Sequence, residues 1–200
     1  MNSKNSNFFL MRHGETETNR NHIWQGSIDE NLNENGRVQA RYAAKLVNEI
    51  NPGIIVSSSM LRARETAKIA SEYLNGVEIK IEPGIRERSC GAAEGLNTGE
   101  ILDRFGVRMD ITSEEVDRIP GAEPFEEFLG RVVSTIESIY DKYHNEKVLI
   151  VSHGGVIRAF YNHRIRTLPP GIVFKNCSII SMSRNGGSWE VVDKYNTEQI

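Results

Sequence analysis

Two histidines, two arginines and one glutamate in this sequence are of types that could together move a phosphoryl group. His13 follows Arg12 directly after one apolar run, and His153 follows another such run. Arg62 comes shortly after a third run, and Glu87 stands between two further arginines. A neutral imidazole is a nucleophile. The guanidinium group of arginine can donate hydrogen bonds to two phosphate oxygens at once, and a carboxylic acid can protonate the oxygen of the leaving group. These types match the needs of phosphoryl transfer, in which spread negative charge must be positioned and stabilised.

Each candidate residue also has an ordinary structural interpretation. Arg12 and His13 could be the solvated end of a strand, and His153 could be a core histidine with satisfied hydrogen bonds. A glycine pair follows His153, however, and this pattern favours a helix N-terminus that is open to an anion. Glu87 could form a surface ion pair, with Glu15 or Glu94 serving as the acid in its place.

The arginines leave similar choices open. Arg64 is a close rival of Arg62, although the motif register favours Arg62. Arg86 could contact the substrate or be solvated. Cys90 lies near the candidate acid by sequence, but no base is evident for it, so core packing is the simpler interpretation.

Apolar runs alternate with amphipathic stretches along the chain, which predicts strands alternating with helices. We expect strands over 8–11, 53–57, 77–81 and 147–152, helices over 34–50, 61–74, 125–143 and 155–165, and a hairpin of 179–183 with 189–192. In the first helix, Val38, Tyr42, Leu46 and Ile50 form the apolar stripe that we expect to face the core. The alternation predicts an α/β fold of three layers, α/β/α, with a mostly parallel sheet covered by helices on both faces.

The candidate residues therefore follow predicted strands, and ligands bind at the carboxyl ends of the strands in open sheets of this kind. The region of about 91–124 is less regular and predicts a small helical insertion over the sheet edge and the active site. No linker or repeat divides the chain, so we expect one domain over 1–200.

The composition sets limits on compartment and partners. Of the 200 residues, 38% are hydrophobic and 26% are charged. The formal net charge is -3, so the chain lacks the excess of basic residues that is typical of nucleic-acid-binding proteins. Two cysteines are too few for a disulfide framework, and no apolar run is long enough for a membrane span. We expect a cytoplasmic protein with no membrane or nucleic-acid partner. No clustered Asp, Glu and His spacing suggests a metal site, and no cofactor is expected.

The motifs, taken together and in order, resemble the histidine phosphatase superfamily, which includes phosphoglycerate mutases and many small-molecule phosphatases. The resemblance covers nearly the whole chain and is anchored in the segment 10–16, LMRHGET. It continues through Asn19, Gln25, Gly26, Asp29, Leu32, Gly36 and Gln39, the segment 57–67, Glu87 with Gly91 and Glu94, and the segment 152–155.

The resemblance implies a role for each site residue. His13 would be the nucleophile that becomes phosphohistidine, and Glu87 would be the proton donor. Arg12, Arg62 and His153 would bind the phosphoryl oxygens. On resemblance alone, Asn19 and the Gly154 N–H would add donors. The predicted substrate-binding set is Arg12, Asn19, Gln25, Gly26, Arg62, Arg86 and Gly154.

Three functions remain as the main alternatives, and a phosphoprotein phosphatase is a further option, although no feature of the sequence indicates peptide recognition. The first is a metal-independent phosphatase of small phosphorylated metabolites. The second is a mutase that returns the phosphoryl group to a substrate hydroxyl, which needs a lid against water. Only 66 positions separate Glu87 from His153, a shorter interval than in the full-sized mutases that the chain resembles, so we favour the phosphatase. The third is a non-catalytic phosphate-binding module. The chain could act as a monomer or as a homodimer.

Overall fold

A computed structural model describes residues 7–108, 111–165 and 174–195. Its sheet has six strands in the order β3-β2-β4-β1-β5-β6. Four are parallel, namely β1 (Phe8–Arg12), β2 (Ile54–Ser58), β3 (Glu78–Glu82) and β4 (Val148–Ser152). The other two, β5 (Ile179–Asn185) and β6 (Ser188–Tyr195), form an antiparallel hairpin at one edge. The mostly parallel sheet and its hairpin are as the sequence predicts.

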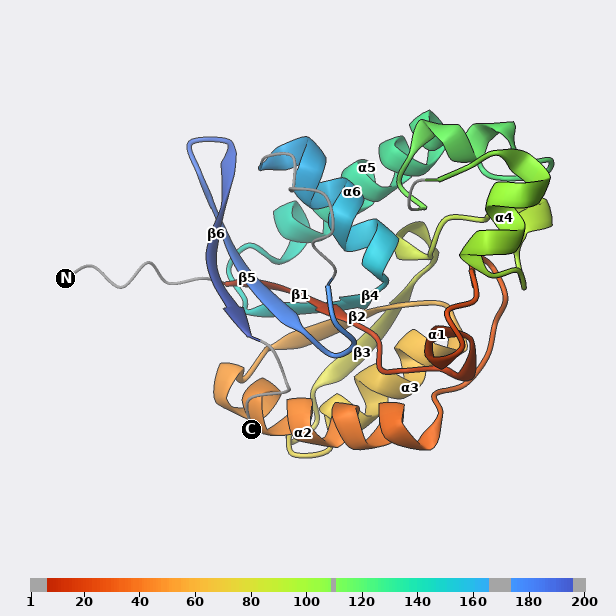
Figure 1. Ribbon diagram of the computed structural model, residues 1–200. Helices are drawn as coiled ribbons and strands as arrows, with labels where there is room; N and C mark the ends of the chain where they lie inside the picture. The colour runs from red at the N-terminus through yellow and green to blue at the C-terminus, as the bar shows by residue number, and fades with distance from the viewer. Residues whose placement is uncertain (1–6, 109–110, 166–173, 196–200) are drawn as a thin grey trace.

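Helices cover both faces of the sheet, which confirms the three-layer α/β/α prediction (Figure 1). One face carries α2 (Glu34–Ile50) and α3 (Leu61–Ala70), and the other carries α5 (Phe125–Tyr143) and α6 (Gly154–Arg164). Successive strand residues point to opposite faces. In β1, accordingly, Phe8 and Leu10 pack on the side of α5, whereas Phe9 and Met11 pack on the side of α2.

Helix α2 has the predicted bounds but turns a different face to the core. Val38 and Tyr42 are exposed, at 37% and 43%, while Ala40, Ala43 and Ala44 are completely buried. The expected stripe is therefore wrong in its first half. Small residues line the inner face, which allows the helix to lie close to its neighbours. Helix α3 is also shorter than expected and ends at Ala70 instead of Leu74.

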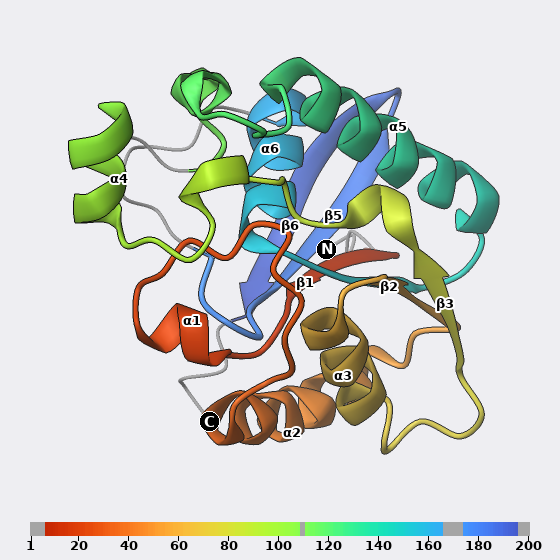
Figure 2. The same cartoon turned by 90° about the vertical axis from the view of Figure 1, so that its right-hand side faces the viewer.

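Short elements connect the main ones at the carboxyl ends of the strands. They are α1 (Glu17–Arg20), the 3₁₀ turns η1 (Pro83–Ile85), η2 (Gly91–Ala93) and η3 (Glu114–Arg118), and helix α4 (Thr98–Phe105). The last three belong to the segment 91–124, which has its own small core around Ile101 and Val116. Figure 2 shows α1 and α4 on the same side of the molecule, beyond the strand ends. No helix in the described ranges has the length and apolar character needed to cross a membrane.

Candidate active site

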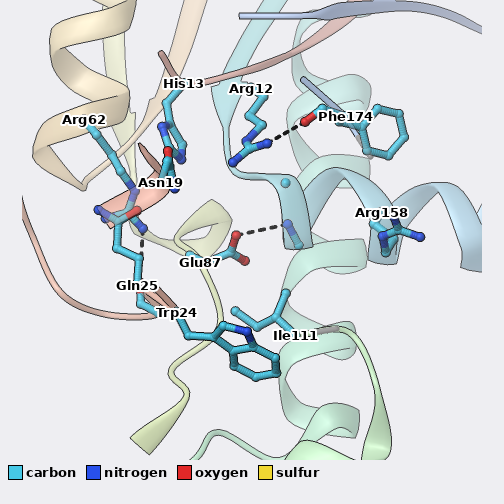
Figure 3. Close-up of a pocket in the computed structure, with 13 residues that line it drawn as sticks. Arg12, His13, Asn19, Trp24, Gln25, Arg62, Glu87, Ile111, Arg158 and Phe174 are labelled. Atoms are coloured by element: carbon cyan, nitrogen blue, oxygen red, sulfur yellow. Dashed lines mark hydrogen bonds between the residues drawn. The ribbon is translucent and has the colours of Figure 1, made fainter. Parts of the chain in front are cut away.

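The carboxyl ends of the parallel strands surround a pocket of about 330 Å³. Arg12 ends β1 and His13 follows it, Arg62 lies in the first turn of α3, and Glu87 follows the turn after β3. Figure 3 shows these side chains directed toward one another. The residues that line the pocket are Arg12, His13, Asn19, Trp24, Gln25, Gly26, Arg62, Glu87, Ile111, Gly154, Gly155, Arg158 and Phe174.

The His13 ring is held so that one nitrogen stays available. Its Nδ1 lies 2.7 Å from the Gly14 carbonyl oxygen, so Nδ1–H donates there and Nε2 keeps its lone pair. The Gly14 N–H in turn donates to Thr66 Oγ1 at 3.0 Å, which holds that peptide in place. Burial lowers the pKa of His13 well below its usual value, and the Arg62 and Arg12 charges lower it further. The ring is therefore neutral at neutral pH, as a nucleophile must be.

Both predicted arginines direct a guanidinium group into the site. Arg12 Nη1 donates to the Phe174 carbonyl at 2.6 Å. Arg62 is completely buried and donates to the carbonyls of Ile28, at 2.7 Å, and Gly26, at 3.1 Å. Burial lowers the pKa of Arg62 to about 10, so this group stays cationic at neutral pH. Arg64, the alternative to Arg62, is exposed.

His153 lies behind the pocket surface beside His13. The side chain is completely buried and is not among the lining residues, but the two ring centroids are only 5.2 Å apart. Its Nε2 lies 2.8 Å from Ser58 Oγ. Burial lowers the pKa of His153 well below its usual value, with the Arg62 charge as the next cause, so this ring is also neutral.

Three buried nitrogen atoms of the site have no hydrogen-bond partner. Over the described ranges, five buried side-chain nitrogen or oxygen atoms are unpartnered, and three of these are Arg12 Nε, Arg62 Nε and His153 Nδ1. Leaving a buried polar group unpaired costs about 1–3 kcal/mol. A phosphoryl group with three oxygens could satisfy all three atoms, so the arrangement is suited to such an anion.

Glu87 is the only carboxylate among the residues that line the pocket in the described ranges. The side chain is 8% exposed, and its two oxygens accept the Gly155 and Arg88 N–H groups, each at 3.0 Å. Burial raises the pKa of Glu87, and these hydrogen bonds offset that rise only in part. A raised pKa favours the protonated form, which a proton donor requires.

The two alternative carboxylates are engaged outside the pocket. Glu15 accepts from Asn33 Nδ2 at 2.8 Å. Glu94 accepts from the Cys90 N–H and from Ser27, and these hydrogen bonds lower the pKa of Glu94 although burial acts in the opposite direction. The geometry therefore favours Glu87 as the acid.

Four more of the predicted substrate-binding residues line the pocket, namely Asn19, Gln25, Gly26 and Gly154. Arg86 does not. Its side chain is 46% exposed and lies 3.8 Å from a Glu123 oxygen, on the outside of the turn that carries the acid. The expected contact between Arg86 and the substrate is therefore not supported by its position.

Five residues that line the pocket were not predicted from the sequence, and Gly155 is one of them. Trp24, Ile111 and Phe174 form apolar walls, and Arg158 lies one helical turn along α6 from Gly154. Trp24, Ile111 and Phe174 lie outside the named helices and strands, where no periodic signal marks their direction. The spacing of Arg158 from Gly154 could have signalled its face, because residues four apart share one side of a helix.

The mostly parallel sheet and the cationic pocket at its strand ends define an α/β protein with a site suited to a phosphoryl group, and the comparisons with known proteins identify a phosphoric monoester hydrolase. The chain belongs to the histidine phosphatase superfamily (branch 1), whose family model matches residues 8–197.

Individual relatives carry phosphatase names. A metal-independent phosphoserine phosphatase of Arabidopsis thaliana is 35% identical over 156 residues, or 76% of this chain and 66% of that protein. The uncharacterized phosphatase PhoE of Bacillus subtilis is 36% identical over 151 residues, 75% of this chain and 72% of the relative. A mycobacterial glucosyl-3-phosphoglycerate phosphatase, solved with VO3, has a TM-score of 0.81 at 27% identity and covers 96% of this chain and 99% of its own. Other relatives have phosphoglycerate mutase-like names.

Proposed function

We propose that the chain is a metal-independent phosphatase that hydrolyses phosphomonoesters of small metabolites through a phosphohistidine on His13. The observation that supports this most is the set of unpartnered side-chain nitrogens of Arg12, Arg62 and His153 around the nucleophile. These groups are held in place before any substrate binds. Donors arranged in advance for developing negative charge are a large source of transition-state stabilisation.

In the first half-reaction, the Nε2 lone pair of His13 attacks phosphorus. The bond between phosphorus and the alcohol oxygen breaks, and the carboxylic acid of Glu87 gives its proton to that oxygen. Arg12 and Arg62 balance the charge on the phosphoryl oxygens throughout. In the second half-reaction, the Glu87 carboxylate takes a proton from water while the water oxygen attacks phosphorus. The P–N bond breaks, inorganic phosphate leaves, and neutral His13 and protonated Glu87 are restored.

The pocket size favours a small metabolite as the substrate. A volume of about 330 Å³ lies at the lower end of the range for small-molecule sites. Trp24, Ile111 and Phe174 would contact the carbon skeleton of the leaving alcohol, because they lie among the lining residues but carry no charge.

The test is release of inorganic phosphate over a panel of phosphorylated metabolites, including the phosphoserine in the name of the Arabidopsis relative. 3-Phosphoglycerate is assayed in parallel for isomerisation, and His13→Ala is the control. We expect phosphate release that the variant lacks. Isomerisation with little phosphate would establish the mutase instead, and neither reaction from folded protein would favour the binding module.

A further inference from the structure

Ser58, the last residue of β2, contacts the second histidine of the site. Its Oγ lies 2.8 Å from His153 Nε2, and both side chains are completely buried. The Met60 N–H also points at Ser58 Oγ, at 3.4 Å, from the loop before α3. The hydroxyl thus lies between a backbone donor and an imidazole nitrogen.

The number of donors and acceptors on Ser58 determines which group donates the hydrogen bond between Ser58 and His153. A serine hydroxyl has one hydrogen to donate and two lone pairs to accept with. The Met60 N–H takes one lone pair of Ser58. Among the described residues, the hydroxyl hydrogen of Ser58 has His153 Nε2 as its acceptor. If Nε2–H donated instead, the hydroxyl hydrogen would be buried without a partner, at a cost. The hydroxyl therefore donates to Nε2.

A donor on Nε2 determines where the ring proton of His153 lies. A neutral imidazole carries one N–H, and the nitrogen that accepts a hydrogen bond is the bare one. The N–H of His153 is then at Nδ1, one of the three unpartnered atoms of the site.

We propose that Ser58 is a positioning residue that holds His153 in the Nδ1–H tautomer, so that the ring presents a third N–H to the phosphoryl oxygens beside Arg12 and Arg62. The inference rests on the proposed function for its purpose, although the tautomer itself is a property of the resting protein. In the other tautomer a lone pair at Nδ1 would meet the phosphoryl oxygens and repel them.

The same tautomer serves opposite purposes in the two histidines. In His13, the Gly14 carbonyl takes the Nδ1–H, which leaves the Nε2 lone pair free for attack on phosphorus. In His153, Ser58 takes the Nε2 lone pair, which leaves the Nδ1–H free for donation. One ring is thereby prepared as a nucleophile and its neighbour as a donor.

The direct test is a long-range ¹H–¹⁵N correlation spectrum of the histidine rings in the resting protein at neutral pH. His153→Asn identifies the signals that belong to this ring. We expect a protonated Nδ1 and a bare, hydrogen-bonded Nε2. A protonated Nε2 would overturn the proposal, whatever the activity of the enzyme.

Variants test the consequence for catalysis. Ser58→Ala is expected to lower kcat/KM by about 10²- to 10³-fold, the range for losing one oriented donor, and to shift the His153 spectrum toward the Nε2–H form. Ser58→Thr, which keeps the hydroxyl, should restore the spectrum and stay within about threefold of the natural protein. The matched control is Ser57→Ala, because Ser57 is also buried at the end of β2 but its Oγ donates to the Ser58 carbonyl at 3.0 Å.

The outcomes separate the positioning role from the proposed function. If Ser58→Ala keeps both its kcat/KM and the Nδ1–H spectrum, Ser58 does not hold the tautomer. If the natural protein shows the Nδ1–H form but releases no phosphate from any ester, the proposed function fails and the structural assignment stands.

Discussion

The rings of His13 and His153 lie with their centroids 5.2 Å apart and their planes inclined at 58°. Their proximity follows from strand register, because Arg12 of β1 pairs with Ser152 of β4 in parallel and each histidine is the next residue. The His13 N–H donates to the Ser152 carbonyl at 2.9 Å and extends this pairing by one bond. Two imidazoles 140 positions apart in the sequence are thus neighbours because their strands are.

Replacing the proposed acid should separate substrates by the quality of their leaving group. We expect Glu87→Gln to lower kcat/KM, which reports only the first half-reaction, by about 10²- to 10⁴-fold for alkyl phosphates, whose alkoxide needs a proton as it departs. The loss should be much smaller for p-nitrophenyl phosphate, whose leaving group needs no proton. Steady-state kinetics on both esters checks this, and an equal loss on both would exclude the acid role.

The raised pKa of Glu87 also predicts the basic limb of the pH profile. The acid form is required, and a carboxyl with a raised pKa keeps its proton to a higher pH. For alkyl phosphates, kcat/KM should therefore fall as the pH rises through the Glu87 pKa of the free enzyme. In Glu87→Gln that limb should disappear, since glutamine does not titrate. A limb that persists unchanged would assign it to another group.

A substitution in the apolar wall should weaken substrate binding, whereas a substitution of Arg86 should not. Trp24→Ala is expected to raise KM for aryl phosphates by about tenfold, because it removes a large contact surface, with little change in kcat.

Arg86→Ala should leave kcat/KM within about twofold, since the side chain lies outside the pocket. A large rise in KM for Arg86→Ala would restore the expected substrate contact.

Chelation should leave the rate unchanged. The guanidinium groups of Arg12 and Arg62 supply the positive charge that a metal would otherwise bring. Over the described ranges, no group of three His, Cys, Asp or Glu side chains could hold an ion. The check is the hydrolysis rate after exhaustive dialysis against EDTA. A large loss that added metal restores would contradict the proposal of metal independence.

Arg88 should be important for stability. It is completely buried, donates to the carbonyls of Ile111, Ser113 and Glu123 at 2.8 Å each, and pairs with Asp117. Arg88→Met should lower the free energy of unfolding by about 3 kcal/mol, because these partners lose their donor.

Urea denaturation measures the effect of Arg88→Met. Arg118→Met, on an exposed residue of the same segment, is the control and should stay within about 0.5 kcal/mol. Equal effects of the two substitutions would contradict the anchoring role of Arg88.

Much of the fold could be predicted because hydrophobic periodicity reports it directly. The strands at 8–12 and 148–152 are short apolar runs, and the helix at 125–143 has a regular stripe. Helix α2 shows where this signal misleads. Its large apolar residues Val38 and Tyr42 suggest the inner face, but close packing selects the alanines instead.

The site was predictable where motifs follow strands and less so elsewhere. Glu87 has an arginine on each side, and the sequence does not show that Arg88 is buried while Arg86 is half-exposed. Trp24 and Phe174 reach the pocket from segments outside the regular elements. Tertiary packing, which has no local pattern, decides the direction of such side chains.

The most direct test of the account is to trap the phosphoenzyme. An enzyme mixed with ³²P-labelled substrate and quenched in base within milliseconds should carry label on one peptide, which contains His13. The label should be stable in base and lost in acid, as for a phosphoramidate, and His13→Ala should carry none. Label on another residue, or turnover by His13→Ala at the natural rate, would contradict the central role of His13.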